Sequence, residues 1–572
     1  MSQSSALAET ILQKLSARGV ELWVEAGALR FRAPRNAIDD ELRREIAANR
    51  DALISILGRR AGPAGDGRIQ PRPLAQEPSL SFAQTRLWYL DQLEPGSPRY
   101  NIGSSLRVRG AVDLDVLALA VDDLFMRHEA FRTCIRAADG KPVLEILPRP
   151  LIALDVVDVS ADPPADIEAA VKRYGREALC TNFDLASGRL ALMRAVRFAP
   201  DNHLIVFVAH HIISDGWSLD LVWRDLHGLV EARATSRPSK LTPLPLQYSD
   251  FATWEQTKAQ AQGFAEDIAY WRETLAGAPN VIQLPFDRPR RPIGSTRGSR
   301  YNRFIEAALI DRLRDVTRER GATLFMGLVA VWQTLLSRLS GQDEIVVGTP
   351  VATRDDERLK DVVGCFINNI ALRGDLSGSP TFTELLERTK RMTLGAFRHD
   401  SLPFDMVVEA VNPPRTLSYA PVFQTLFTLL NFHTGLPASS QVDSAPLDAD
   451  TGTARFDLSL ELALVSHGAH AGDLLAAYEY DSDLFDEATI ARLHVQFLRL
   501  LEAACENPLE SLHKAPLNSP EERRALVAMC QSQVTDVDLT PFPQQFERQV
   551  RSAPGRCAVS FEGSQLPYDG LN

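Results

Sequence analysis

The chain has 572 residues, which is more than one hydrophobic core usually supports, so we expect several domains. Its apolar content of 45% and charged content of 24% are ordinary for a globular protein. With 62 basic against 74 acidic residues the net charge is −12, which argues against nucleic-acid binding as the main function.

The N-terminus and the cysteines indicate the cellular compartment in which the protein is expected. It contains no run of 18 apolar residues, and its first ten residues, MSQSSALAET, lack the basic and apolar parts of a signal peptide. The six cysteines are scattered and include no C-x-x-C pair. We therefore expect a cytoplasmic protein with reduced thiols, no membrane segment and no bound metal.

Residues 1–60 are predicted to form a small unit of two helices and a hairpin. Apolar residues recur at helical spacing up to Gly19, and a second amphipathic helix begins at Asp39. Between them, in VELWVEAGALRFRA (20–33), apolar and polar residues alternate on both sides of Gly27, which predicts a β-hairpin. Such a short unit has a marginal core, so homodimerisation or docking to a partner would help to complete it.

The rest of the chain divides at two stretches that lack an apolar period. Between these stretches, strand-like apolar runs alternate with amphipathic helices, which predicts an α/β (or α+β) domain large enough for two lobes. The last segment holds one helix and one strand, too little for a core, so we expect the start of a domain whose remainder is missing. The predicted boundaries are 61–78 for the first linker, 79–255 and 256–510 for the lobes, 511–540 for the second linker and 541–572 for the last segment.

The segment FVAHHIISDGWS (207–218) carries the strongest chemical pattern. An apolar strand ends in His210 and His211, and Asp215 and Gly216 then open a helix. Adjacent strand residues point to opposite faces, so only one ring can face a given cavity while the other packs behind it. An imidazole suits general base work near neutral pH, and a glycine at a helix start can leave an N–H open to a developing oxyanion.

Several interpretations of this segment compete. Both histidines could be satisfied inside a core, beside Asp215 as an N-cap, and Asp215 could otherwise be a nucleophile, a metal ligand or an ion-pair partner. A metal site lacks a third ligand at matching spacing, and a serine triad lacks a G-x-S-x-G element. The complete pattern H-H-x-x-x-D-G-W-S is more specific than any of its parts.

Seven segments in order resemble the motifs of condensation domains from non-ribosomal peptide synthetases. The departures are Phe131, Ile135, Phe251 and Asn369, where the family usually has Leu, Phe, Tyr and Thr, and the last two segments match more loosely. The segments are SFAQTRLWYLDQLEPGSPRYNI (81–102), RHEAFRTCI (127–135), the histidine segment, YSDFATW (248–254), VGCFINNIALR (363–373), HDSLPFD (399–405) and RTLSYAPVF (415–423).

This resemblance implies two lobes similar to chloramphenicol acetyltransferase, arranged as a V-shaped pseudo-dimer with a central tunnel. A donor acyl or peptidyl thioester enters from one side and an acceptor aminoacyl thioester from the other. Both are carried on 4′-phosphopantetheine arms of carrier proteins, so the chain itself is expected to bind no cofactor. The acceptor amine attacks the donor carbonyl and the thiol leaves; the opening motif resembles the subtype that joins an L-donor to an L-acceptor.

The resemblance also implies roles for individual residues. His211 would face the tunnel as base or positioner of the amine, with His210 packed behind it. Asp215 would be structural, with Arg132 or Arg354 as its cationic partner; the sequence does not choose between the two arginines. The remaining residues implied for the substrate tunnel are Arg86, Trp217, Ser218 and Asn368.

Both ends of the chain resemble further parts of such synthetases. Residues 1–60 are similar to docking domains that receive the tail of an upstream subunit, with Trp23, Arg30, Phe31 and Arg32 of the hairpin as docking residues. FEGSQLPYDGLN, at the end, resembles the first motif of an adenylation domain, and no phosphate-binding loop follows it. The implied partners are the upstream tail, the donor and acceptor carrier proteins and a downstream adenylation domain.

Three related classes fit less well. A stand-alone acyltransferase that uses coenzyme A shares H-x-x-x-D-G but would not need the flanking docking and adenylation-like parts. An epimerization domain has a similar fold, yet residues 81–102 and the DGWS sequence fit condensation better. A cyclization domain would carry an aspartate in place of His210.

Overall fold

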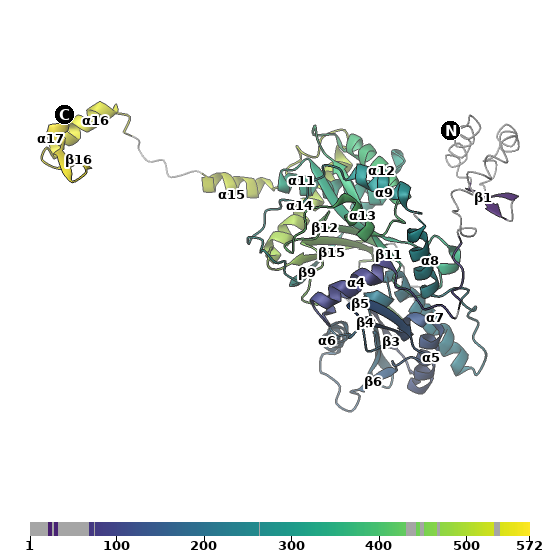
Figure 1. The fold of residues 1–572 in the computed structure, drawn as a ribbon. Helices are drawn as coiled ribbons and strands as arrows, with labels where there is room; N and C mark the ends of the chain where they lie inside the picture. Colours follow the sequence, from purple (N-terminus) through teal and green to yellow (C-terminus); the bar gives the residue numbers. More distant parts are fainter. Residues whose placement is uncertain are drawn as a thin grey trace, which may run out of the picture. The chain divides into compact units, whose positions relative to one another are not determined.

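The computed structural model describes most of the chain, in two compact units, Met1–Ala515 and Pro516–Asn572. The described residues are 21–25, 28–32, 68–73, 75–261, 263–430, 442–446, 451–465, 470–530 and 538–572. The first unit contains two mixed sheets with their own helices, which can be followed in Figure 1 by the labels β12 and β15 for one and β3 and β6 for the other. This is the mixed α/β, two-lobed architecture that the sequence predicts.

The first lobe is built on a five-stranded sheet with β8 near its centre. The run HLIVFVAH in β8 is buried throughout, as expected for an inner strand covered on both faces. Only the β6–β7 pairing is parallel among the described pairs of this sheet. In spatial order the strands are β13 (Val442–Pro446), β3 (Asn101–Arg109), β8 (Asn202–His210), β7 (Ala191–Ala199) and β6 (Leu154–Asp158).

Helices and a separate hairpin complete the first lobe. Each of its three main helices begins at an aspartate whose carboxylate accepts a backbone N–H of the first turn, the usual N-cap arrangement. These elements are α5 (Leu114–Arg127), α6 (Ile167–Leu179) and α7 (Gly216–Ala234), with the short helices η1 (Pro98–Tyr100), η2 (Glu129–Arg132) and η3 (His211–Ile213) and the hairpin β4 (Thr133–Ala138) and β5 (Lys141–Ile146).

The second lobe has a six-stranded sheet whose inner strand β12 is parallel to both neighbours. In spatial order the strands are β11 (Ile367–Asp375), β10 (Glu344–Ala352), β12 (Thr425–Leu430), β14 (Leu458–Leu464), β15 (Leu474–Asp481) and β9 (Gly298–Ile305). The main helices of this lobe are α10 (Ala307–Glu319), α11 (Leu324–Ser340), α12 (Phe382–Arg398) and α14 (Glu487–Glu506).

The second lobe also contains the most apolar helices. Among the described residues no single helix is long and apolar enough to cross a membrane; α10 and α11 meet that length and composition only as a pair, bent by 105°. Most side chains of α11 are buried in the lobe, including Trp332. Its apolar composition is therefore that of a core helix.

The two lobes exchange chain segments, so the predicted boundary at residues 255 and 256 separates them only in chain order. β13 belongs to the predicted second lobe but pairs with β3 of the first sheet, with Pro446 opposite Ser104. Residues 359–366, which include the end of η4 (Glu357–Leu359), join the hydrophobic core of the first lobe. Four further helices complete the described unit, and among them α4 contacts α8 and α13 contacts α9. Their bounds are α4 (Phe82–Leu93), α8 (Tyr248–Gln260), α9 (Ala265–Thr274) and α13 (Phe404–Val411).

Both predicted linkers are partly packed against the lobes. Ile69 is buried, and the backbone N–H of Arg72 donates to Asp250 Oδ1 at 2.7 Å. Beyond the second lobe, Leu512 is buried and its carbonyl accepts from Arg338 at 3.1 Å. The packed part of the chain therefore includes Ile69, ten residues before the predicted start of the first lobe at 79, and Leu512, two residues past the predicted end at 510.

The hairpin predicted for residues 20–33 is confirmed. β1 (Glu21–Glu25) and β2 (Ala28–Arg32) pair in antiparallel register, with Trp23 opposite Arg30. The two helices predicted on either side of it lie outside the described residues. So do the side chains of the predicted docking residues.

The second unit contains one helix where the sequence predicted a linker. α15 (Pro520–Cys530) is preceded by Ser519, whose hydroxyl accepts the N–H of Glu522 while the Glu522 carboxylate accepts the N–H of Ser519. This is a capping box, and the S-x-x-E spacing in the sequence could have revealed it. The remaining elements are α16 (Phe542–Ser552), β16 (Cys557–Phe561), β17 (Ser564–Pro567) and α17 (Tyr568–Leu571).

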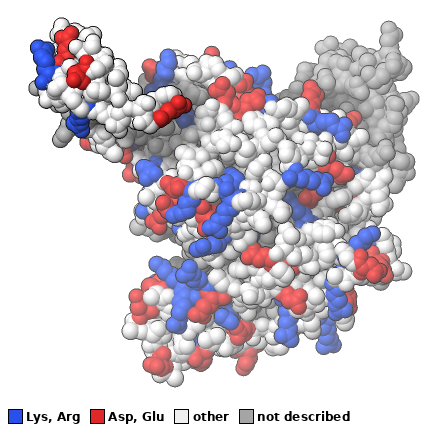
Figure 2. Space-filling view, turned by 60° about the vertical axis from the view of Figure 1, so that its left-hand side comes forward, with Lys and Arg blue, Asp and Glu red and all other residues white. Residues whose placement is uncertain are grey.

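Charges on the face drawn in Figure 2 are mixed in sign. Figure 2 shows groups of lysine and arginine side chains and groups of aspartate and glutamate side chains on the same face, with wide uncharged areas between them. This distribution agrees with the net charge of −12.

Candidate active site

The histidine pair lies where the central strand of the first lobe ends. β8 stops at His210, whose Nδ1 accepts the backbone N–H of Ile212 at 3.1 Å and so fixes the turn into η3. From α4, the side-chain amide of Gln84 donates to the Ile212 carbonyl at 3.1 Å. His211 is thus the first residue of a short helix that is held from two sides.

Both histidines are buried, with exposed fractions of 1% for His210 and 7% for His211. Burial, and then the charge of His211, lowers the pKa of His210 to about 3. Burial, followed by the guanidinium of Arg455, lowers the pKa of His211 to about 4, although Asp215 opposes this shift. Both rings are therefore neutral near pH 7.

The surroundings of His211 come from both lobes. Its Nδ1 lies 3.9 Å from Sγ of Cys365, which belongs to the segment that crosses from the second lobe. Arg455 is held by Glu479, whose Oε1 accepts the backbone N–H of Arg455 at 2.9 Å and lies 3.5 Å from its Nε. Arg455 was not predicted from the sequence, because one arginine ahead of a strand forms no recognisable pattern.

Asp215 is bonded to both lobes. Its Oδ1 accepts the backbone N–H of Ser218 at 2.8 Å, which caps α7 directly before Gly216. Arg354 Nη2 lies 3.0 Å from Oδ1 and 3.2 Å from Oδ2, and both side chains of this ion pair are 5% exposed. The N–H of Phe366 donates to Oδ2 at 3.1 Å. Asp215 therefore joins the start of α7 to the segment 354–366.

Of the two arginines that the sequence left open, the structure pairs Arg354 with Asp215. Arg354 also donates to the carbonyls of Leu359 and Val362, at 2.8 and 2.6 Å, and its guanidinium lies 4.0 Å from the ring centroid of Phe366. Arg132 instead donates to the Leu147 carbonyl at 2.6 Å. The alternative partner Arg132 was wrong because the end of η2 directs this arginine to the residue after β5.

Two of the four residues expected for the tunnel make contacts between the lobes. Trp217 is 37% exposed and its indole N–H donates to the carbonyl of Lys360 at 2.9 Å. Ser218 is fully buried, and its hydroxyl donates to Asp215 Oδ1 at 2.6 Å and lies 3.1 Å from the N–H of Gly364. Neither of these two residues lines the cavity described next.

A small cavity of about 20 Å³ adjoins the histidine site through Cys365. It lies between α4, α8, the start of β11 and residues 401–405, and the other two expected residues, Arg86 and Asn368, line it together with Glu255 and Asp405. The amide of Asn368 donates to the carbonyls of Asp400 and Leu402, at 2.8 and 2.7 Å, and its Oδ1 accepts the N–H of Phe404. Asn368 therefore shapes the cavity wall.

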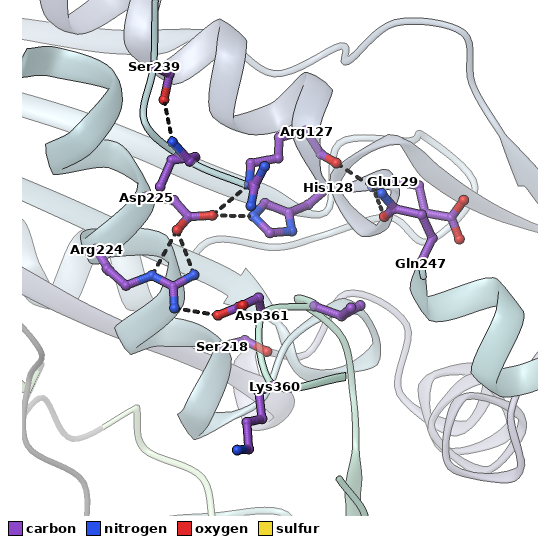
Figure 3. A network of polar contacts seen from close by, with 12 residues as sticks. Arg127, His128, Glu129, Ser218, Arg224, Asp225, Ser239, Gln247, Lys360 and Asp361 are labelled. Atoms are coloured by element: carbon purple, nitrogen blue, oxygen red, sulfur yellow. Dashed lines mark hydrogen bonds and ion pairs between the residues drawn. The ribbon is translucent and has the colours of Figure 1, made fainter. Parts of the chain in front are cut away.

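A second buried aspartate lies further along α7. Figure 3 shows Asp225 between Arg127, His128 and Arg224, with Arg224 reaching Asp361. Burial raises the pKa of this carboxyl, but hydrogen bonds from His128 and Arg224 outweigh it and lower the pKa to about 2.

Metal ligands do not gather in the described residues. Within those ranges no three His, Cys, Asp or Glu side chains are grouped as a metal ion would require.

Two family models match separate parts of the chain. Residues 75–527 match the model of the condensation domain, and residues 9–58 match that of the TubC N-terminal docking domain. A crystal structure of the X-domain from teicoplanin biosynthesis superposes with a TM-score of 0.70 at 26% identity, over 78% of this chain and 99% of that one.

Two curated relatives are larger synthetases. The dimodular nonribosomal peptide synthase from Bacillus subtilis is 35% identical over 86% of this chain, which spans only 21% of that protein. Phosphinothricin tripeptide synthetase PhsC from Streptomyces viridochromogenes is 36% identical over 93% of this chain, which spans 49% of it. The chain thus belongs to the condensation-domain family, in the form found in non-ribosomal peptide synthetases, and carries a TubC-type docking domain at its N-terminus.

Proposed function

We propose that this chain forms an amide bond between two substrates, each bound as a thioester to a carrier protein. The donor is an acyl or peptidyl thioester and the acceptor an aminoacyl thioester, both on 4′-phosphopantetheine arms that the carriers supply. The observation that carries the proposal is the neutral, buried His211, held between segments of both lobes beside a cavity. Membership of the condensation-domain family supports the same reaction class.

The reaction exchanges one bond for another at the donor carbonyl. The acceptor nitrogen attacks the carbonyl carbon, the C–N bond forms, the C–S bond breaks, and the sulfur leaves as the thiol after taking a proton. The nitrogen can attack only as a free amine. An α-ammonium has a pKa of about 7.7 to 8.0, so it must lose a proton before this step.

His211 is better suited to positioning the amine than to deprotonating it. With a pKa of about 4, the ring lies nearly four units below an α-ammonium, so proton transfer to it would be uphill by about 5 kcal/mol. A neutral imidazole nitrogen can still accept a hydrogen bond from the amine and orient it. Correct orientation can contribute about 7 to 11 kcal/mol through effective molarity.

The docking domain and the far end of the chain define the proposed partners. Residues 1–60 receive the tail of an upstream synthetase subunit through the hairpin β1–β2, to which an extended peptide could add as a further strand. Residues 541–572 begin an adenylation domain. The donor and acceptor are of the L-configuration, and the reaction takes place in the cytoplasm.

The test is single-turnover amide formation with both carriers loaded, for the wild type and three variants. His211→Ala should lose at least about 10²-fold in rate while keeping the wild-type thermal midpoint. His211→Gln, which keeps a hydrogen-bond acceptor, should recover part of this loss if the role is positioning. His227→Ala, at an exposed position on α7, is the control. Amide formation by His211→Ala at the wild-type rate would refute the proposal.

A further inference from the structure

The proposed reaction needs a proton acceptor for the acceptor's α-ammonium, and His211 is a poor candidate. The inference below rests on that proposed function. Two carboxyl groups, those of Glu255 and Asp405, line the cavity beside Cys365, and neither takes part in the steps described above. Because the Cys365 thiol both lines this cavity and lies 3.9 Å from His211 Nδ1, the cavity is separated from the histidine by one side chain.

The cavity is matched to a small polar group. A volume of about 20 Å³ is slightly more than the roughly 10 to 15 Å³ that a single water needs. An amino or ammonium group is of similar size, whereas most amino-acid side chains would not fit. The lining groups are suited to such an occupant, because two carboxyl groups, Glu255 and Asp405, face the same small space.

One carboxylate oxygen of Glu255 accepts a hydrogen bond from the backbone of α4. From α8 its Oε2 accepts the backbone N–H of Phe82, the first residue of α4, at 2.9 Å. In the described part of the chain no donor is bonded to Oε1 and no ion pair includes this carboxyl. Burial raises the pKa of Glu255 to about 7, although the Phe82 N–H and the charge of Lys258 act against it.

The charged and titratable groups around Glu255 do not neutralise it. Lys258, on the same helix, places its ammonium over the rings of Phe264 and Trp254, at 4.2 and 5.3 Å from their centroids, and 3.5 Å from Ser401 Oγ. Four other groups face the region: Asp405 on α13, Arg86 on α4, and the neutral side chains of Tyr248 and Cys365.

The described lining of the cavity contains more carboxyl groups than cations. Burial also raises the pKa of Asp405, against the lowering effect of Arg86. Arg86 is the only cation among the described residues that line the cavity, whereas two carboxyl groups line it. Among the described residues Glu255 has no ion-pair partner, and an ammonium group from the substrate would supply one.

We propose that Glu255 is the proton acceptor of the reaction: its carboxylate receives the acceptor's α-ammonium in this cavity and takes one proton from it. The ammonium N–H bond breaks and the Glu255 O–H bond forms, which leaves a neutral amine and a neutral carboxylic acid. The amine then moves past Cys365 to His211, which orients it toward the donor carbonyl. After release of the product, Glu255 returns its proton to water.

The titration of Glu255 suits this role. A proton acceptor works best when its pKa lies near the working pH. An acid with a pKa of about 7 is largely ionised at pH 7.5 and only slightly weaker as a base than the amine it serves. Asp405 assists by adding a second negative potential at the same cavity.

The experiment measures single-turnover amide formation by the wild type and Glu255→Gln between pH 6.5 and 9, with both carriers loaded. Glutamine keeps an oxygen for the Phe82 N–H but cannot take a proton. At pH 6.5 only about 5% of α-amino groups are unprotonated, whereas about a quarter of the Glu255 carboxyl, with its pKa of about 7, is ionised, so the variant should be about fivefold slower than the wild type. At pH 9 the amine is already free, and the two rates should agree within twofold.

Two further variants distinguish this role from a structural one. Glu255→Asp retains a carboxylate and should recover part of the rate at pH 6.5. Glu502→Gln, on the exposed side of α14, should match the wild type at every pH. Equal rates for Glu255→Gln and wild type at pH 6.5, or one constant loss at all pH values, would overturn the proposal. Absence of amide product from the wild type would instead refute the proposed function.

Discussion

Asp215 and Asp225 are two buried aspartates at the start and in the middle of one helix, and both lie in networks that reach the segment 354–366. Their partners differ in origin. Asp215 pairs directly with Arg354 of that segment, and both side chains are 5% exposed. Asp225 pairs with Arg127, His128 and Arg224 of its own lobe, and only Arg224 extends the network to Asp361 (Figure 3).

Of the two aspartates, Asp215 makes the contact that connects the lobes at the active site. Asp215 fixes the start of α7, the Phe366 backbone and Arg354 at once, within a few residues of His211 and Cys365. Asp225 organises the inside of the first lobe, and its arginines keep access to water, with side chains 14% exposed for Arg127 and 42% for Arg224. Loss of the Asp215 carboxylate should therefore lower the free energy of unfolding more than loss of the Asp225 carboxylate.

The largest effect is expected for Asp215→Ala. It leaves the Arg354 guanidinium buried without its carboxylate, and such a loss typically costs about 3 to 5 kcal/mol. The denaturant midpoint should fall accordingly, and amide formation should fall with it, since the Phe366 backbone beside Cys365 loses its anchor. An unchanged midpoint with lost activity would instead make Asp215 a catalytic residue.

A smaller effect is expected for Asp225→Asn at neutral pH. Asparagine keeps one oxygen for hydrogen bonds, and the two arginines can turn toward water. We therefore expect the free energy of unfolding to fall by about 1 to 3 kcal/mol. Because the folded-state pKa of Asp225 is lowered from 3.8 to about 2, its stabilisation is present above pH 4 and is lost as the pH falls through about 2. The variant should therefore differ from the wild type at pH 7 and approach it near pH 2. A constant difference between these pH values would contradict the assignment.

The sequence predicted the fold well where the pattern is local. The hairpin at residues 20–33 and the buried strand before His210 follow from alternation and from a continuous apolar run. It could not predict that residues 442–446 complete the sheet of the first lobe, because an edge strand supplied from more than 300 residues along the chain leaves no local signal.

The candidate site was predictable to the extent that motifs mark it. Motif resemblance named Asp215, both histidines and two possible arginines, but only the packing of residues 354–366 on α7 distinguishes Arg354 from Arg132. Trp217 and Ser218 lie next to the motif aspartate in the sequence, yet the first turn of α7 directs them to contacts with the second lobe. Glu255 and Arg455 belong to no charge pattern, and their environments arise only when distant segments pack together.

The smallest effect is expected for Asp361→Asn, at the end of the Asp225 network. Asp361 accepts from Arg224 Nη1 at 2.5 Å, but the two side chains are 44% and 42% exposed. Exposed ion pairs contribute about 0 to 1 kcal/mol and weaken with salt. Arg224 also keeps its two hydrogen bonds to Asp225 Oδ1, so the buried part of the network remains complete. The variant should therefore lower the denaturant midpoint slightly at low ionic strength and match the wild type at high salt. A loss as large as that of Asp215→Ala would show that this outer pair, rather than the Asp215–Arg354 pair, holds residues 354–366 on α7.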